Sequence, residues 1–276
     1  MRVLCVLAQR NEVACLEPWV RYHSYMVGME NIHIIDNASD DPGVLAKLEE
    51  YNRLGIGVTR IPPGTDFNLR GRYTADVIAN IESEIDFDFV FSMDCDEFLA
   101  VFKPDGTPSC RRQDVMNYLT SLKLREGMYQ IPGGMENING APGRFIWRSH
   151  YKKVYFSNRQ CLDLDIGYHN GTPRNGLPRY DGQIFYVHYQ VRPYNMFRKM
   201  ARQKLEPFVN PDDPEALRNH KGNNLHLTGL FALSEEEYNA TLEAQRQREH
   251  ELERAFPEFE CLLKILGLNP NIFEGY

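Results

Sequence analysis

Short apolar runs alternate with segments of helical apolar spacing over the first hundred residues of this 276-residue chain. Four continuous apolar runs predict buried strands, at residues 3–8, 32–35, 56–61 and 89–93. Between them lie three predicted helices, at residues 16–27, 44–51 and 73–81. Strands that alternate with helices predict a parallel sheet with helices on both faces, because parallel strands need crossover connections. We therefore expect an α/β fold.

This alternation fades after residue 100. Further strands are predicted at residues 128–131 and 183–190, and a strand or hairpin at 145–156, with a glycine-rich loop at 133–143. Further helices are predicted at residues 113–122, 192–205 and 234–254, the last of them a polar surface arm. We expect one domain over residues 1–205, followed by a helical C-terminal extension over 206–276.

Composition excludes several classes of function. The chain has 31 Lys and Arg against 38 Asp and Glu, so it lacks the basic excess that gripping a nucleic acid requires. No apolar run reaches the roughly 18 residues that a membrane span needs. The six cysteines form no CxxC pair, which predicts reduced thiols and a cytoplasmic location rather than a zinc site.

The sharpest local signal is the sequence FSMDCDEFL at residues 91–99. A strand that ends here delivers Asp94 and Asp96, and alternation along the strand predicts that both leave on the same side. Both can then approach one hard divalent cation, or one can hold a ribose while the other holds the metal. An isolated pair of this kind is more often a solvated acidic turn, so the interpretation depends on its context.

Polar residues also follow two other predicted strands. Asp36, Asn37 and Ser39 offer a carboxylate, an amide and a hydroxyl, groups that suit a uracil edge and ribose hydroxyls. Arg10 and Glu12 follow the first strand. Parallel sheets bind ligands at the carboxyl ends of their strands. Each cluster alone is an ordinary polar turn, but together they favour a nucleotide site at one edge.

In this order, the elements resemble family 2 glycosyltransferases of the GT-A fold, in particular the branch related to family 92. Three elements carry the resemblance, and they are Arg10-Asn11-Glu12, the DNxS element with Asp36, Asn37 and Ser39, and the DxDEF element with Asp94, Asp96, Glu97 and Phe98. Weaker matches extend it to about residue 205, at Lys152 or Lys153, His169, and His188-Tyr189. The chain departs from the family in three places. Arg10 stands where the family usually has Lys, Asp41-Pro42-Gly43 interrupts the usual loop after the DNxS element, and no clear Glu-Asp pair marks the base.

The resemblance implies a nucleotide-diphospho-sugar transferase with a Rossmann-like mixed sheet, in which residues 1–100 bind the nucleotide and 101–205 the acceptor. It implies a metal-dependent enzyme that moves a sugar from a nucleoside-diphosphate donor, expected to be a UDP-sugar, to a hydroxyl acceptor, expected to be a glycan. The expected donor-binding residues are Arg10, Glu12, Asp36, Asn37, Ser39, Arg72, Asp94 and Lys153. Arg72 and Lys153 are preferred for the phosphates over Arg70, Lys152, Arg192 and Lys199.

A divalent cation, Mn²⁺ or Mg²⁺, would neutralise charge on the leaving diphosphate. Asp96 is the first expected ligand, with Asp94 reaching the metal or the ribose. His188 is the expected third ligand and His169 the second choice, although either histidine can instead be a hydrogen-bonded structural residue. His23 lies on the apolar face of its helix and is expected in the core.

An inverting transfer also needs a base for the acceptor hydroxyl. Glu136 is the first candidate, ahead of Asp163 and Asp165, and an ordinary loop carboxylate is the competing interpretation. We therefore expect Glu136 and Asp94 as the catalytic residues.

Three other classes of protein compete with the transferase. One is a non-catalytic nucleotide- or glycan-binding module on the same fold, which would release no diphosphate. Another is a DxD phosphohydrolase, which expects its motif on the first strand with Thr or Val where Phe98 stands. A nucleotidyltransferase expects a glycine-rich phosphate loop after the first strand, where Arg10 to Glu12 stand instead.

Overall fold

The computed structural model describes residues 1–65, 69–123, 125–222 and 224–275. Its larger sheet contains seven strands in the order β13-β7-β10-β4-β1-β2-β3. They span Val3–Gln9 (β1), Ile32–Asn37 (β2), Gly57–Ile61 (β3), Phe89–Met93 (β4), Met128–Ile131 (β7), Lys153–Ser157 (β10) and Arg179–Asp181 (β13). Strands β1 to β4 are mutually parallel, and β10 is antiparallel to both β4 and β7. The predicted parallel arrangement of the first hundred residues is confirmed, within a mixed sheet.

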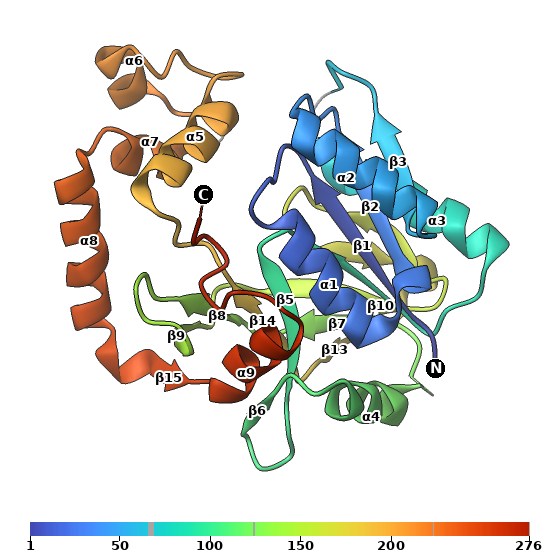
Figure 1. Ribbon diagram of the computed structural model, residues 1–276. Coiled ribbons are helices and arrows are strands. Elements are labelled where there is room, and N and C mark those ends of the chain that lie inside the picture. The colour runs from blue at the N-terminus through green and yellow to red at the C-terminus, as the bar shows by residue number, and fades with distance from the viewer. Residues whose placement is uncertain (66–68, 124, 223, 276) are drawn as a thin grey trace.

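Helices cover both faces of this sheet (Figure 1). They are α1 (Leu16–Val27), α2 (Pro42–Arg53), α3 (Arg70–Glu84) and α4 (Arg112–Leu122). In β1, Cys5 and Leu7 belong to the apolar cluster that contains α1, whereas Leu4 and Val6 belong to the cluster that contains α3. Alternate side chains of β1 thus enter opposite layers, which explains why the strand reads as a continuous apolar run. The strand order 3-2-1-4 is that of a Rossmann-type half-sheet.

A second sheet has the order β15-β9-β8-β14-β5-β6. Its strands span Glu97–Phe102 (β5), Pro108–Ser109 (β6), Gly134–Asn137 (β8), Arg144–Arg148 (β9), Ile184–His188 (β14) and Glu253–Ala255 (β15). The prediction of a loop over residues 133–143 is wrong in part, because β8 lies inside it. A Cβ on Gly133 would lie 2.4 Å from the Arg148 carbonyl oxygen, so glycine here marks a close strand approach rather than a turn.

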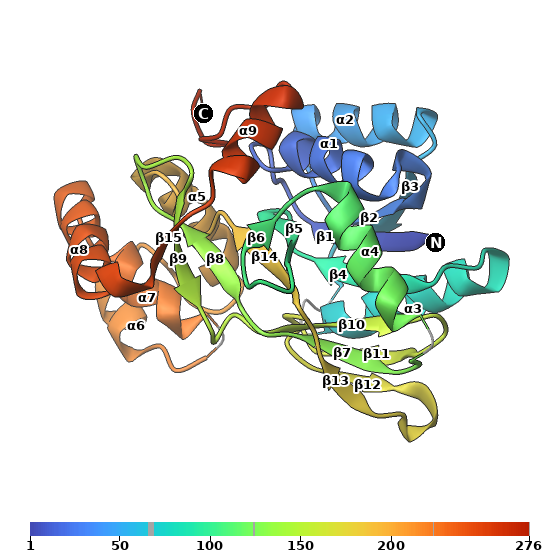
Figure 2. The same ribbon diagram turned by 90° about the horizontal axis from the view of Figure 1, so that it is seen from below.

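A small hairpin of β11 (Cys161–Leu164) and β12 (Gly171–Pro173) lies beside β7, β10 and β13 (Figure 2). Leu164 and Tyr168, from this hairpin and its connection, join the apolar cluster of α3. The connection between β11 and β12 therefore passes close to the end of β10 that carries Lys153, and it contributes to the site described below.

The C-terminal residues form a helical cluster and then return to the main core. Helices α5 (Tyr194–Leu205), α6 (Pro214–Asn219), α7 (Leu225–Phe231) and α8 (Glu235–Arg248) share an apolar cluster of their own. Figures 1 and 2 show this cluster at the opposite end of the molecule from α3. Helix α8 is shorter than the predicted arm over 234–254, since β15 begins at Glu253.

Helix α9 (Pro257–Ile265) packs beside α1 rather than in the helical cluster (Figure 2). Phe256, Phe259 and Leu263 are buried in the main core. These side chains of α9 and the residue before it therefore pack in the same core as the first sheet, and the domain boundary at residue 205 stays a prediction. His23 is fully buried, as expected, and all six cysteines are unpaired. Among the described residues, no helix has the length and apolar character to cross a membrane.

Candidate functional site

The ends of β1 and β2 bring together the first polar cluster, which we call the Asp36 cluster (Gln9, Asn11, Asp36 and Ser39). The Gln9 side-chain amide donates a hydrogen bond to Asp36 Oδ1 at 2.7 Å, and Asp36 is only 2% exposed. The Asn11 N–H donates to Ser39 Oγ at 2.9 Å, and Asn11 itself has a left-handed φ of 53°. Parallel pairing of β1 with β2 thus places three of the expected polar residues together. Asn37 ends β2 but makes none of these hydrogen bonds.

The DxD residues lie in the turn between β4 and β5, where the chain passes from the first sheet to the second. Strand alternation ends at Met93, and the two carboxylates contact different cations. Asp94 forms ion pairs with Arg70 and with Lys153, whose Nζ lies 2.7 Å from Asp94 Oδ2. The expected placement of both carboxylates on one side by strand alternation therefore does not apply.

Two buried cations control the charge of Asp94. Burial opposes ionisation of this carboxyl, but the charges of Arg70 and Lys153 outweigh burial and hold the pKa of Asp94 well below its usual range. The Lys153 side chain is 2% exposed, and its Nζ also lies 3.0 Å from Glu97 Oε2. The ring of Tyr168 lies beside both cations, 4.7 Å from the Arg70 guanidinium carbon and 5.1 Å from Lys153 Nζ.

Asp96 faces a different pair of groups. Arg192 Nη2 lies 2.9 Å from Asp96 Oδ2, and His188 Nε2 lies 3.5 Å from Asp96 Oδ1. Burial opposes ionisation of Asp96, but the charges of His188 and Arg192 outweigh burial and lower the pKa of Asp96. Arg192 also lies 3.1 Å from Glu12, so the element after β1 is joined to the DxD turn.

We tested whether these side chains fit the divalent cation that the resemblance implies. Among the described residues, no group of three or more His, Cys, Asp or Glu side chains is placed to hold a metal ion. Asp96 and His188 nevertheless offer a carboxylate oxygen and an imidazole nitrogen 3.5 Å apart, and His188 Nδ1 is buried without a hydrogen-bond partner. This mixed oxygen and nitrogen pair fits a cation that takes its remaining ligands from a bound diphosphate.

Glu136 lies in the same row of the second sheet as His188. In the strand register, His188 pairs with Glu97 on one side and with Glu136 on the other, so these side chains share one face of the sheet. The Arg148 guanidinium donates to Glu136 Oε1 at 2.5 and 3.0 Å, and the Tyr151 hydroxyl donates to Oε2. Glu136 is thus a buried, charge-paired carboxylate on strand β8, and not a loop carboxylate.

Several expected residues lie elsewhere. Arg10 and Arg72 are exposed and form no hydrogen bond or ion pair within the described ranges, whereas Arg70 contacts Asp94. His169 Nδ1 lies 2.6 Å from the Lys152 carbonyl oxygen, and no contact joins its ring to either aspartate of the DxD turn. Asp165 accepts the His169 and Asn170 N–H groups and holds that loop, while Asp163 is exposed on β11.

Sequence reasoning missed Gln9, Tyr168 and Arg148. The sequence pattern could have identified Gln9, because it is the polar residue that ends the apolar run of β1. Tyr168 and Arg148 come from a hairpin connection and from β9, and their positions depend on strand registers that no local pattern specifies.

Comparisons with known proteins give similarity to solved structures only, because no family model and no curated protein matches the chain. Staphylococcus aureus TarS is similar over 86% of this chain and 43% of its own, with 12% identity and a TM-score of 0.43. The mannosyltransferase PcManGT from Pyrobaculum calidifontis, in complex with GDP-Man and Mn²⁺, is similar over 96% of this chain and 79% of its own, with 14% identity and a TM-score of 0.41. TarS 1–349 in complex with UDP-GlcNAc covers 86% of this chain at 11% identity, with a TM-score of 0.41. The chain thus spans less than half of the longer TarS structure, and the similarity at these identities concerns the fold.

Proposed function

We propose that this chain is a glycosyltransferase that moves a sugar from a nucleoside-diphosphate donor to a hydroxyl of a glycan. A UDP-sugar is the first donor to test. The observation that carries the proposal is that Asp36 lies at the same carboxyl edge of the parallel strands as Asp94 and Asp96, which are paired with the buried cations Lys153 and Arg192. Ligands of open α/β sheets bind at this edge.

The Asp36 cluster is the proposed nucleoside site. Its carboxylate can accept hydrogen bonds from ribose hydroxyls or a base edge. The Gln9 side-chain amide and the Ser39 backbone N–H donate to Asp36 Oδ1 and fix its orientation, and Ser39 Oγ accepts a second hydrogen bond from the Gln9 amide. Because Asp36 is buried and already hydrogen-bonded, it is preorganised for this role before any ligand arrives.

Arg70 and Lys153 are the proposed diphosphate cations. Both are paired with Asp94, so an anion that binds beside this carboxylate would lie next to both cations. Negative charge grows on the diphosphate as the bond from the anomeric carbon to the phosphate oxygen breaks. Fixed cations stabilise that charge in a site shielded from water.

Asp96 and His188 are the proposed protein ligands of Mn²⁺ or Mg²⁺. A bound cation of this kind neutralises charge on the diphosphate. Arg192 holds the Asp96 carboxylate in place through its second oxygen. If this assignment is right, His188→Ala raises the Mn²⁺ concentration needed for UDP binding and leaves the melting temperature of the metal-free protein nearly unchanged. A large loss of metal-free stability with unaltered metal dependence would instead assign His188 to the core.

Glu136 is the proposed base. The acceptor oxygen forms a bond to the anomeric carbon, its proton passes to Glu136, and the nucleoside diphosphate leaves with the electron pair of the broken bond. Arg148 and Tyr151 orient the carboxylate, and the row shared with His188 sets it beside the proposed metal ligand.

Calorimetry with UDP and GDP tests the donor site. We expect one of the two to bind in Mn²⁺ and to bind at least about tenfold more weakly with a chelator, because the diphosphate would then face Asp94 and Asp96 without the added cation. Asp36→Asn should weaken binding under both conditions, whereas Asp86→Asn, in an exposed ion pair, should not. Equal affinity with and without Mn²⁺ would contradict the metal role, and no binding of either nucleotide would contradict the donor site.

A further inference from the structure

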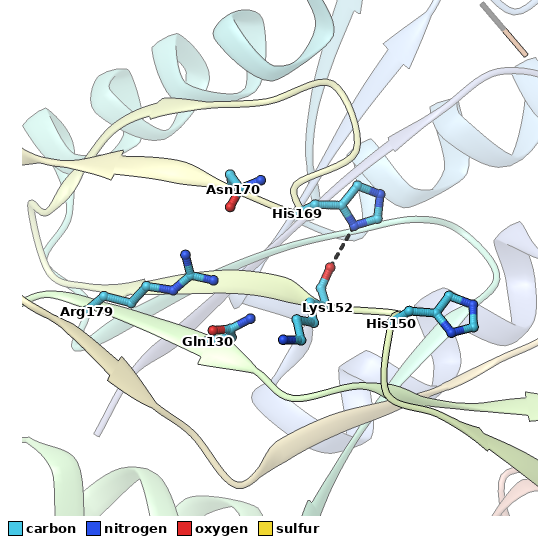
Figure 3. Close-up of a pocket in the computed structure, with 6 residues that line it drawn as sticks. All are labelled: Gln130, His150, Lys152, His169, Asn170 and Arg179. Carbon is cyan, nitrogen blue, oxygen red and sulfur yellow. Dashed lines mark hydrogen bonds between the residues drawn. The ribbon is translucent and has the colours of Figure 1, made fainter. Parts of the chain in front are cut away.

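A polar hollow of about 510 Å³ lies on the first sheet beside the β11–β12 connection (Figure 3). Its lining side chains come from four segments of the chain, and they are Gln130, His150, Lys152, His169, Asn170 and Arg179. None of them is a carboxylate, and four carry or can carry positive charge. In a chain with a formal net charge of −7, this local excess of basic groups is unusual.

Within the part of the chain that the structure describes, these basic side chains form no hydrogen bond or ion pair with a carboxylate, and the carboxylate contacts of their loop are backbone hydrogen bonds. Within the described residues, Lys152 and Arg179 form no ion pair, in contrast to Arg148 and Arg246, which line another cavity and are each paired with glutamates. Asp165 contacts two of the lining residues, but only through their backbone, since its two oxygens accept the N–H groups of His169 and Asn170. The charge of Lys152 and Arg179 is therefore available to a ligand.

The hollow adjoins the proposed donor site without being part of it. Lys153 and Lys152 are consecutive, and Lys153 Nζ contacts Asp94 and the Gly167 carbonyl oxygen. The Lys152 carbonyl oxygen contacts His169 instead, as the dashed line in Figure 3 marks. No lining side chain contacts a DxD carboxylate. Arg70 and Lys153, the cations proposed for the donor diphosphate, are not among the residues that line the hollow.

We propose that this hollow binds the oxyanion of an acidic acceptor, a phosphate or a carboxylate carried on a sugar. The acceptor assignment rests on the proposed function, whereas the oxyanion site does not. A guanidinium offers paired N–H donors that match the oxygens of phosphate and carboxylate, and Lys152 adds a point charge. The amides of Gln130 and Asn170 are suited to sugar hydroxyls. The volume lies in the range of small-molecule sites, larger than a lone ion requires.

Titration with three sugars tests the site. Glucose 6-phosphate carries a phosphate and glucuronate carries a carboxylate. Glucose has the same sugar ring without a charge and serves as the control. We expect one or both acidic sugars to shift the resonances of His150 and His169 in a saturable way, with glucose giving no shift. The double variant Lys152→Gln/Arg179→Gln should weaken this binding at least about tenfold, because both unpaired charges are then lost.

The matched control is Arg218→Gln/Lys221→Gln, which removes two exposed charges of the helical cluster. It should leave binding of the acidic sugars unchanged. Equal binding by wild type and the Lys152/Arg179 variant would overturn the proposal, as would displacement of the acidic sugar by UDP at concentrations that saturate the donor site. Absence of UDP binding would count against the proposed function alone, because the sugar titration does not depend on the donor.

Discussion

Lys153 Nζ lies 2.7 Å from the Asp94 carboxylate, 59 residues away in sequence, at a position where the lysine side chain is 2% exposed. A lysine is held at such depth only with charged partners, and here it has two, Asp94 and Glu97. This contact joins β10 to the turn after β4. It makes Lys153 both a structural cation and the proposed diphosphate contact.

Lys153→Met therefore has a stability effect as well as a functional one. Methionine keeps the length of the side chain but leaves Glu97 without its cation, and breaking a buried pair costs on the order of 3 kcal/mol. Urea unfolding measures this loss. The control Lys123→Met removes a surface ion pair with Asp88 and should cost less than about 1 kcal/mol. Equal costs for the two variants would show that the pairing of Lys153 adds nothing to the fold.

Asp96→Asn removes the negative charge of the proposed metal ligand and keeps the size of its side chain. The amide has nearly the same size, and Arg192 keeps its second partner Glu12, so the protein should still fold. Its melting temperature should fall, because the ionised Asp96 carboxylate is stabilised by His188 and Arg192 in the folded protein. Transfer should fall by about a hundredfold or more, since charge stabilisation at the diphosphate is lost. Steady-state kinetics on Asp96→Asn and on the surface variant Asp86→Asn compare the two. Near-normal turnover of Asp96→Asn would show that the acidic turn is structural.

Glu136→Gln tests the proposed base, because loss of a base should lower kcat without changing the affinity for UDP. General base catalysis contributes about 10²–10⁴ in rate, so kcat should fall by that order while the Kd for UDP stays unchanged. Tyr151→Phe keeps the carboxylate and removes one of its hydrogen-bond donors, and it should lower kcat far less. A variant Glu136→Gln with full kcat would remove the base assignment and leave Glu136 as the partner of Arg148.

Glu258, in the first turn of α9, should contribute to the stability of the fold in a way that depends on pH. Burial opposes ionisation of Glu258, but hydrogen bonds from Cys110 N–H and the Ser109 hydroxyl, with the charge of Arg111, lower its pKa in the folded protein. A lowered carboxyl pKa stabilises the fold above the unfolded pKa, near 4.5, and this stabilisation is lost as pH falls through the folded pKa. The difference in melting temperature between wild type and Glu258→Gln should therefore be present at pH 6 and shrink toward pH 3. A difference independent of pH would contradict this sign.

The strands and helices of the first hundred residues could be predicted from the sequence, because local apolar patterns determine where they lie. The apolar runs of β1, β2 and β4 report burial on both faces, and the parallel pairing then places Asp36 near the DxD turn. The branch of the resemblance related to family 92 stays a prediction. Lys153 was selected from the sequence, and the structure places it on Asp94.

The remainder depends on long-range register. Arg70 rather than Arg72 faces Asp94 because only one side of α3 reaches the sheet edge, and the start of that helix has no capping signal to fix its phase. His169 had the residue type of a ligand, but its loop turns it toward the Lys152 carbonyl. Strand β8 was hidden because Gly133 and Gly134 usually indicate a turn, whereas here they permit close packing against Arg148 and Tyr186.

Release of nucleoside diphosphate from a panel of nucleotide sugars is the most direct measurement of the central claim. With Mn²⁺ and a mixture of neutral and acidic glycan acceptors, we expect one donor to yield its diphosphate together with a glycosylated acceptor, and Asp96→Asn to abolish most of both. A protein that binds UDP or GDP and releases no diphosphate from any donor would contradict the transferase and identify a non-catalytic binding module.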